Sequence, residues 1–459
     1  MTPLTLGKAR VLIVGLGRSG IAAARLCVSF GAKVTVTDNR KHSQLTEAKK
    51  ALREEVTWEV GGHKLETFVN ADLIVLSPGV PSLPELEAAK RANVPIVGEL
   101  ELSARFAKAP IVAITGTNGK STTTSLIGAM LQAAQKPCFC GGNLGQPFAE
   151  VIGTEVDSPN GIAVLEVSSF QLETVEEFHA HVALLLNTSE DHLDRYSSYQ
   201  EYLCAKKRIF ERQTPQDFAV VNGNPNQHDA RELAAETAAR VLLFCTQGPH
   251  KEQCKQKSGA WLEGDQLMIK LPDEEPEVYS RQLLKLPGLH NSENALAALL
   301  AARLVGASKA DCEQALRNFS SLPHRMEFVR ELDGVRYYND SKATNVGSVV
   351  GSLTGFEHPV ILITGGKDKG GDYTPMATVI ADVCRHVILI GAATPIMEKA
   401  FIGIKPLHKV ATVEQAVRLA KDLSQKGDAV VLCPACSSYD MFKNFEERGL
   451  VFAEAVNKL

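Results

Sequence analysis

Three stretches of the chain combine a run of apolar, mostly β-branched residues with glycines and then change to a helical spacing of apolar positions. They read RVLIVGLGRSG at residues 10–20, IVAITGTNGKS at residues 111–121 and PVILITGG at residues 359–366. Uninterrupted apolar runs are typical of strands buried on both faces, and strands that alternate with helices form parallel sheets. We therefore expect an α/β protein whose ligands bind at the carboxyl ends of the strands.

Two segments interrupt this alternation and indicate where domains meet. FAKAP, near residue 105, precedes a new strand, and SSLPHRMEF, near residue 322, follows an Ala/Leu-rich helical pattern between Asn294 and Val305. A chain of 459 residues is also too long for one hydrophobic core. We expect three domains, at residues 1–108, 109–321 and 322–459.

The composition narrows the class of protein. Hydrophobic residues make up 44% of the chain and charged residues 22%, which is typical of a globular protein, and a net charge of -4 favours no nucleic-acid partner. No apolar run approaches the roughly 18 residues of a membrane-spanning helix. The ten cysteines are scattered without paired C-x-x-C spacing, which indicates free thiols in a reducing compartment. We expect a cytoplasmic protein without membrane insertion.

The first glycine-rich turn has the spacing of a dinucleotide-binding fingerprint. In GLGRSG, Gly15, Gly17 and Gly20 follow a strand and open a helix, and the next strand ends in Asp38, placed for a ribose hydroxyl. Glycines let the backbone approach a pyrophosphate, and the helix N-terminus supplies N–H groups. These features suit NAD, another nucleotide such as a UDP-sugar, or a tight turn alone. A later turn, SPGVP at residues 77–81, either closes over the same ligand or is an ordinary strand end.

The second glycine-rich turn has the pattern of a phosphate-binding loop that lacks one residue. The consensus G-x-x-x-x-G-K-[ST] would place its first glycine at Ile114, whereas this chain has GTNGKS from Gly116 to Ser121. Gly116 and Gly119 allow backbone N–H groups to point inward, Lys120 can reach the β- and γ-phosphates, and the Ser121 hydroxyl can bind Mg²⁺. The alternative is a chance Gly-Lys-Ser turn, but the flanking strand and helix favour phosphate binding.

Two strand ends and one helix carry further candidate groups. Glu166 lies near the end of IAVLEVSSF, and another strand runs into Asp191, His192 and Asp194. An acid beyond a buried strand beside a phosphate loop is a common way to hold Mg²⁺. Lys206 lies on the apolar stripe of a helix, where a desolvated amine has a lowered pKa and could take up CO₂ as a carbamate. Spacing alone favours the alternative, a lysine that reaches water at the edge of the stripe.

Nine motifs in order make the chain resemble the Mur ligase family over essentially its whole length. They are GTNGKSTT, GGNLG, LEVSSFQLE, NTSEDHLDRY, PGLHNSENALAA, LPHRMEF, NDSKATN, GGKDKG and CPACSSYDMFKNFEERG. The last of them, with NDSKATN, is similar to the D-glutamate-adding branch of the family. The resemblance implies a Rossmann-like N-terminal domain, a P-loop ATPase-like central domain with a mostly parallel sheet, and a Rossmann-like C-terminal domain.

The activity that the resemblance implies is ATP-dependent amide formation in peptidoglycan precursor synthesis. The substrates would be UDP-N-acetylmuramoyl-L-alanine and D-glutamate, and the cofactors two Mg²⁺ ions and a carbamate on Lys206. Transfer of the γ-phosphoryl group of ATP to a substrate carboxylate would give an acyl phosphate, which the amine of D-glutamate attacks. Because three domains would deliver three substrates, we also expect domain closure that excludes water. We expect a monomer.

The resemblance assigns roles residue by residue. For the UDP-sugar it implies Gly15, Leu16, Asp38, Asn39, Arg40, Gly79 and Asn143. For ATP it implies Gly116, Thr117, Asn118, Gly119, Lys120, Ser121, Thr122, Asn291, Asn294, Arg325 and Asp340. For D-glutamate it implies Thr344, Lys369, Ser438 and Phe445. For metal it implies Ser121, Glu166, His192 and Lys206 as its carbamate, and for catalysis Lys120, His192, Lys206, His324 and Lys342.

Several alternatives stay open at the level of the sequence. A sister ligase for another amino acid, or a folylpolyglutamate synthase, would share most of the motifs. An NAD-dependent oxidoreductase would use GLGRSG but leave the phosphate loop without a role, and a nucleotide switch would hydrolyse ATP slowly. Individual residues also have ordinary interpretations, since Lys342 and Lys369 could be exposed lysines at strand ends and Ser438 a helix N-cap.

Overall fold

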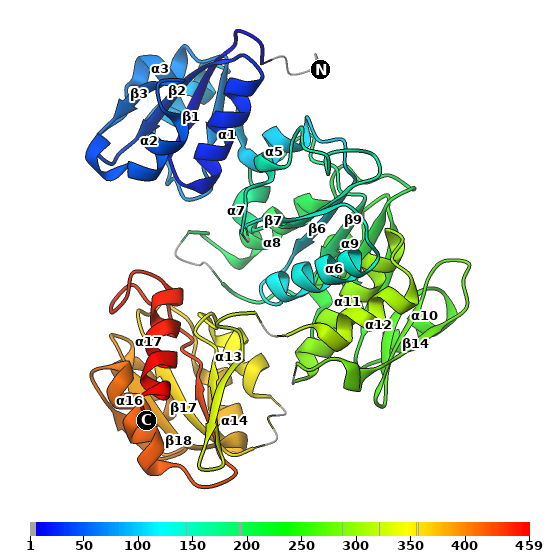
Figure 1. Cartoon of the computed structure of the whole chain (residues 1–459), viewed down its shortest axis with the longest axis vertical. Helices are drawn as coiled ribbons and strands as arrows, with labels where there is room; N and C mark the ends of the chain where they lie inside the picture. Colours follow the sequence, from blue (N-terminus) through cyan, green and yellow to red (C-terminus); the bar gives the residue numbers. More distant parts are fainter. Residues whose placement is uncertain are drawn as a thin grey trace.

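The chain folds into three lobes, each built on its own β-sheet (Figure 1). The structure is a computed structural model and describes residues 6–143, 145–191, 195–286, 288–320, 322–354, 356 and 358–459. Within these residues the sheets have five, nine and six strands in chain order. Most neighbouring strands are parallel, so the predicted α/β fold is confirmed. No helix in the described part of the chain is long and apolar enough to cross a membrane.

The N-terminal sheet has the strand order β3-β2-β1-β4-β5, with all neighbours parallel. The chain reverses its direction across the sheet between β1 and β4, and such a switch point opens a crevice at the strand ends. The strands are β1 (Arg10–Val14), β2 (Lys33–Asp38), β3 (Thr57–Val60), β4 (Leu73–Leu76) and β5 (Ile96–Gly98). The helices are α1 (Arg18–Ser29), α2 (Thr46–Leu52), α3 (Leu65–Val69), α4 (Pro84–Arg91) and α5 (Glu99–Ala104).

The central sheet has the order β14-β13-β12-β11-β10-β9-β6-β8-β7 and is parallel from β12 to β7. Only β13 and β14 add an antiparallel end to the described sheet. The strands are β6 (Ile111–Thr115), β7 (Cys138–Gly142), β8 (Ile162–Glu166), β9 (Val182–Leu185), β10 (Phe218–Asn222), β11 (Arg240–Cys245), β12 (Gly259–Glu263), β13 (Gln266–Lys270) and β14 (Glu277–Ser280). The helices are α6 (Lys120–Ala133), α7 (Ser169–Leu172), α8 (Tyr199–Lys207), α9 (His228–Ala234), α10 (His250–Gln256), α11 (Leu289–Leu304) and α12 (Lys309–Asn318).

The C-terminal sheet has the order β15-β16-β20-β17-β18-β19, in which only β15 is antiparallel to its neighbour among the described strands. The strands are β15 (Glu327–Leu332), β16 (Val335–Asn339), β17 (Val360–Gly365), β18 (Cys384–Ile390), β19 (Leu407–Lys409) and β20 (Ala429–Leu432). The helices are α13 (Val346–Leu353), α14 (Thr374–Val383), α15 (Thr394–Phe401), α16 (Val413–Leu423) and α17 (Phe445–Asn457).

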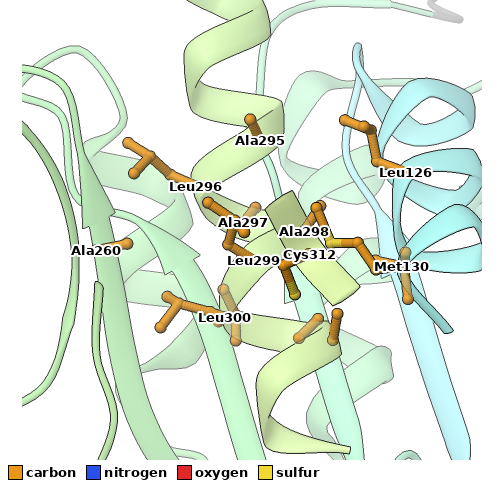
Figure 2. Packing of buried hydrophobic residues seen from close by; sticks show 14 of the residues in the cluster. Leu126, Met130, Ala260, Ala295, Leu296, Ala297, Ala298, Leu299, Leu300 and Cys312 are labelled. Carbon is orange, nitrogen blue, oxygen red and sulfur yellow. The ribbon is translucent and has the colours of Figure 1, made fainter. Parts of the chain in front are cut away.

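The helix that follows the phosphate loop is anchored in the largest apolar cluster of the central domain. Leu126 and Met130 of α6 face α11, and Cys312 of α12 lies beside Met130 (Figure 2). The alanines of α11 let these helices approach closely, while its Leu296 packs toward the sheet with Ala260. Because such interiors are close-packed, the start of α6 has a well-defined position for the loop before it.

Candidate active site

A cavity of about 470 Å³ lies at the carboxyl ends of β1, β2 and β4. The turns at residues 15–19 and 77–81 both line it. Asn143, which follows β7, adds a wall from the central domain. All the residues that the sequence suggested for a UDP-sugar line this cavity: Gly15, Leu16, Asp38, Asn39, Arg40, Gly79 and Asn143.

Asp38 is held by the protein itself at the edge of this cavity. Its carboxylate accepts hydrogen bonds from the backbone N–H of Leu16, at 2.8 Å, and from the Arg40 guanidinium, at 2.8 and 2.9 Å. Burial opposes the charge of Asp38, but these hydrogen bonds outweigh it and lower the pKa to about 2. In the structure, therefore, Asp38 orients the first glycine turn and Arg40 rather than presenting two unpaired oxygens to a ribose.

The shortened phosphate loop joins β6 to α6, as its sequence predicted. Gly119 has a φ of 85°, and a Cβ atom there would lie 2.2 Å from Oδ1 of Asn294, so a side chain is excluded at this position. Asn294 donates to Asn291 Oδ1 at 3.2 Å within the first turns of α11, and both are buried. Asn294 thus lies against the loop although it is 171 residues from Thr123 in sequence, and Asn291 is hydrogen-bonded to it.

A chain of hydrogen bonds runs from the C-terminal domain through the phosphate loop to a central-domain residue that lines the N-terminal cavity. Arg325 donates to the Ser121 hydroxyl at 2.5 Å, and that hydroxyl donates to Glu166 Oε2 at 2.5 Å. The Asn143 amide donates to Glu166 Oε1 at 2.7 Å and thereby reaches the N-terminal cavity. The tertiary structure therefore brings the suggested nucleotide, metal and sugar residues into one continuous site.

The charges at this junction favour an ionised carboxylate. Burial opposes the charge of Glu166, but Lys120 and the hydrogen bonds from Ser121 and Asn143 lower its pKa overall. Burial lowers the pKa of Lys120, whose ammonium donates to the carbonyl groups of Gly116 and Thr117 at 2.8 and 2.9 Å. The carboxylate and hydroxyl oxygens of Glu166 and Ser121 are the donors that Mg²⁺ prefers, so this pair fits a magnesium ion.

Lys206 lies inside the protein, on α8. Its side chain is 1% exposed, and its ammonium donates to the Gly116 carbonyl at 2.9 Å and lies 4.5 Å from the ring centre of Tyr202. Burial, reinforced by Lys120, lowers the pKa of Lys206 far below its usual value. The alternative that Lys206 extends to water is therefore wrong.

His192, suggested as a metal ligand and catalytic residue, lies outside the described residues.

The remaining suggested ATP residues lie in the loop, in the first turn of α6 and after β16. Asn118 donates its backbone N–H to Asn187 Oδ1 at 2.8 Å, and Thr117 is hydrogen-bonded to the Tyr202 hydroxyl at 3.0 Å. Thr122 lies in the first turn of α6. Asp340 is buried directly after β16, where it accepts from the Met326 N–H at 3.1 Å and from the Ser352 hydroxyl at 2.6 Å.

Two groups of C-terminal residues include positions that the sequence suggested for catalysis and for D-glutamate. The Lys342 ammonium lies 3.9 Å from the ring centre of Phe445, and the His324 ring stands edge-on to the same ring at 6.1 Å. Burial lowers the pKa of Lys342 to about 8, which contradicts the interpretation of Lys342 as an ordinary exposed lysine. Lys369 donates to the Thr344 hydroxyl at 3.5 Å.

Ser438 is buried between β20 and α17, and it is not the N-cap of the following helix. That role belongs to Asn444, whose side chain accepts from the Glu447 N–H. Among the described residues, none accepts a hydrogen bond from the Ser438 N–H. A buried backbone donor without a protein acceptor is rare.

Three residues at this site went unrecognised in the sequence. Asn345 and Ser348, at the start of α13, donate to Asn118 Oδ1 of the phosphate loop at 3.4 and 2.6 Å. Arg448 is 1% exposed and lies under the C-terminal loops. A signal for Arg448 was present, because it precedes Phe452 and Val456 at a spacing of four on the buried stripe of α17.

Comparison with known proteins assigns the chain to a class of ligases. Residues 9–98 match the MurD-like N-terminal domain of Mur ligases, residues 114–302 the Mur ligase middle domain, and residues 324–436 the Mur ligase glutamate ligase domain. The chain therefore belongs to the Mur ligase family.

Relatives with assigned names extend this similarity over nearly the whole chain. A UDP-N-acetylmuramoylalanine--D-glutamate ligase from Geotalea uraniireducens is 44% identical over 454 residues, which cover 98% of this chain and 97% of the relative. A protein of the same name from Koribacter versatilis is 41% identical, with 98% and 97% covered.

Solved structures agree with the fold. UDP-N-acetylmuramate-alanine ligase MurC from Thermotoga maritima aligns with a TM-score of 0.60 at 18% identity, covering 98% of this chain and 99% of its own. A pseudomurein peptide ligase type C from Methanothermus fervidus gives the same TM-score at 20% identity, with the same coverage. The three-domain architecture is thus that of the family.

Proposed function

We propose that this protein uses ATP to join D-glutamate to the carboxyl group of UDP-N-acetylmuramoyl-L-alanine in peptidoglycan precursor synthesis. The observation that carries the proposal is the 44% identity to a relative of that specificity across 98% of the chain. The continuous line of contacts from the N-terminal cavity through Glu166 and Ser121 to Arg325 supports it, since the substrate carboxylate must meet the γ-phosphate of ATP. The domain limits in this proposal are 1–108, 109–321 and 322–459.

The phosphate of ATP serves to activate a poor electrophile. A carboxylate does not react with an amine in water, whereas an acyl phosphate has a good leaving group. Both the carboxylate and ATP are anionic, so cations must hold them together and stabilise the charge of the transferring group. Lys120 and Arg325 are half-buried cations at the loop, and Lys342 would stabilise the acyl phosphate from the amino-acid side.

The UDP-sugar and D-glutamate would bind where the protein offers groups that suit their phosphates and carboxylates. The cavity at residues 15–19 and 77–81 would hold the uridine diphosphate, with glycine turns close to its phosphates. Lys369 and Thr344, which contact one another, would bind a carboxylate of D-glutamate by charge and hydrogen bond. The buried N–H of Ser438 would bind a carboxylate as well.

Ser121 and Glu166 would hold Mg²⁺, which supplies positive charge to the phosphate oxygens. We include in the proposal a second ion, held by Glu166 and His192, and a carbamate on Lys206. A carbamate would replace an ammonium that is buried beside Lys120 with an anionic group, and it would thereby remove a repulsion between two cations.

The amino-acid specificity is tested by phosphate release with UDP-N-acetylmuramoyl-L-alanine, ATP and a panel of amino acids. We expect release with D-glutamate and none above background with L-lysine or diaminopimelate. Release with either of these but not with D-glutamate would reject the proposed specificity. ATP turnover that ignores the amino acid would instead indicate a nucleotide switch.

The carbamate is tested by substitution of Lys206. Lys206→Ala should lose most activity, on the order of a hundredfold or more, because a charged group at the centre of the site is lost. Added acetate or bicarbonate should restore part of the activity where a short anion fills the space. Full activity of Lys206→Ala would remove the carbamate from the mechanism.

A further inference from the structure

Arg448 is a fully buried cation that forms no direct ion pair with a described carboxylate. Its side chain is 1% exposed, and among the described residues no carboxylate forms an ion pair with it. Burial lowers the pKa of Arg448 to about 10, which still leaves the guanidinium charged at neutral pH. Asp440 attracts this guanidinium without forming an ion pair with it. A buried charge without a directly paired counter-ion is unfavourable, so a further anion close to it would be stabilised.

All hydrogen-bond partners of this guanidinium belong to two loops of the amino-acid site. The guanidinium donates to the Ser341 carbonyl at 2.8 Å and to its hydroxyl at 3.0 Å. It also donates to the Cys436 carbonyl at 3.2 Å and to the Ser437 carbonyl at 3.4 Å. The bonded residues immediately precede Lys342 in one loop and Ser438 in the other.

These contacts also orient the donors of the site. In a trans peptide the C=O and N–H groups point in opposite directions, so binding of the Ser437 carbonyl turns the Ser438 N–H away from the guanidinium. That N–H is buried and has no acceptor among the described residues. The positive charge and the aligned peptide dipole therefore act in the same direction, toward an anion placed at Ser438.

We propose that Arg448 is a positioning residue that makes the amino-acid site selective for a dicarboxylate, through its charge and without touching the substrate. The proposal rests on the proposed function, in which D-glutamate binds beside Ser438 and Lys342. An anionic side chain on the substrate adds a nearby counter-charge, whereas a neutral amide of the same shape does not. The expected discrimination is about tenfold or more for charges a few ångströms apart at a partly screened site.

Two substitutions separate the charge from the hydrogen bonds. Arg448→Gln keeps amide donors for the loop carbonyls but removes the charge, and Arg448→Lys keeps the charge but loses the planar fork. Arg330→Gln is the matched control, because Arg330 donates to the Val456 and Asn457 carbonyls at the far end of α17. The measurements are KM for D-glutamate and for ATP, kcat, and the inhibition constant of D-glutamine.

We expect Arg448→Gln to raise KM for D-glutamate about tenfold or more while the D-glutamine constant and KM for ATP change less than about threefold. Arg448→Lys should keep KM for D-glutamate within about threefold, and Arg330→Gln should match the unsubstituted protein. Equal weakening of D-glutamate and D-glutamine, an unchanged KM in Arg448→Gln, or equal effects of both substitutions would overturn the proposal.

These measurements also distinguish a wrong role for Arg448 from a variant that does not fold and from a wrong proposed function. If thermal unfolding shows that Arg448→Gln does not fold, Arg448→Lys becomes the test. A KM for D-glutamate within about threefold of the unsubstituted value would support the proposal, and a rise of about tenfold would contradict it. Absence of turnover with D-glutamate in the unsubstituted protein would contradict the proposed function. Turnover with an unaltered KM in Arg448→Gln would contradict only the role of Arg448.

Discussion

At the scale of single residues, the most informative positions are cations that lie where the hydrophobic pattern calls for an apolar side chain. Lys206 and Arg448 occupy buried stripes of α8 and α17, and each is 1% exposed. Charged side chains are almost never fully buried unless they are paired or functional. Both positions can therefore be recognised in a sequence by their spacing, but their burial is established only by the structure.

Lys342 should give the reaction an alkaline limit. Burial lowers its pKa to about 8, so its ammonium is protonated below that pH and loses its charge above it. If the charge stabilises the acyl phosphate, kcat should fall as pH rises through about 8. Lys342→Arg should be slower but lack this limit, because arginine stays protonated. A flat profile to pH 9.5 in the unsubstituted protein would contradict this role.

Deprotonation of Lys342 cannot cause the fall in kcat by unfolding the protein. A lysine whose folded pKa is about 8 and whose unfolded pKa is near 10.5 binds more protons in the unfolded state between those values. Its contribution to the free energy of unfolding therefore rises with pH in this window. Thermal unfolding recorded beside the kinetic profile separates the two effects.

At the scale of elements, the close approach of α1 to the first glycine turn decides whether the N-terminal cavity forms. A Cβ atom at Gly20 would lie 1.9 Å from the Gly15 carbonyl oxygen, whereas one at Gly17 would meet nothing within 4 Å. Gly20→Ala should destabilise the domain by about 1–3 kcal/mol and weaken UDP-sugar binding, because α1 must shift. Gly17→Ala should leave the thermal unfolding unchanged. Equal behaviour of both variants would contradict the packing argument.

The start of α13 has two separable roles. Asn345 Oδ1 accepts from the Ser348 N–H at 2.7 Å as the helix N-cap, and its amide donates to Asp191 at 3.0 Å in the central domain. Asn345→Ala should lower the free energy of unfolding by about 1 kcal/mol. Asn345→Asp keeps the cap but places a carboxylate beside Asp191, so it should lose turnover more than stability.

A second N-cap provides the control for this prediction. Thr412 caps α16 by accepting from the Gln415 N–H at 3.2 Å, away from the site. Thr412→Ala should lose stability comparably to Asn345→Ala without a change in KM for ATP. Full turnover in Asn345→Asp would show that the contact with the central domain has no role in the reaction.

At the scale of the whole molecule, the three sheets have separate apolar cores that share few residues. The N-terminal core also includes Ala149, which belongs to the central domain and joins the two. The central and C-terminal domains are connected mainly by polar contacts, such as those of Arg325 and Asn345. Ligands that bind different domains should therefore stabilise different parts of the molecule.

Thermal unfolding should resolve this organisation. A UDP-sugar alone should raise the transition of the N-terminal domain, and a non-hydrolysable ATP analogue with Mg²⁺ should raise that of the central domain. When each ligand is present at a hundredfold excess over its Kd, it should raise the free energy of unfolding of its domain by about 2.7 kcal/mol. EDTA should abolish the effect of the ATP analogue but not that of the UDP-sugar. A single transition raised equally by either ligand would contradict independent cores.

Much of the fold and part of the site could be predicted from local patterns. The strands before both glycine turns, the helix after Lys120 and the α/β class follow from periodicity and glycine positions, which depend on neighbours a few residues away. Motif order pointed to the family that the comparisons establish. The roles assigned to individual residues from this resemblance stay predictions.

The chemistry of the site was decided by tertiary structure. Arg325 meets Ser121 across 204 residues of sequence, and the pairing of Asp38 with Arg40 depends on the path of a turn. Burial of Lys206 and Arg448 depends on which helices and loops cover them, which no local period specifies. The sequence by itself determined where strands and glycine turns lie, because these obey short-range sterics. Only the packed domains decided which charges lose their water and which partners remain for them, because solvation is a property of the whole surface.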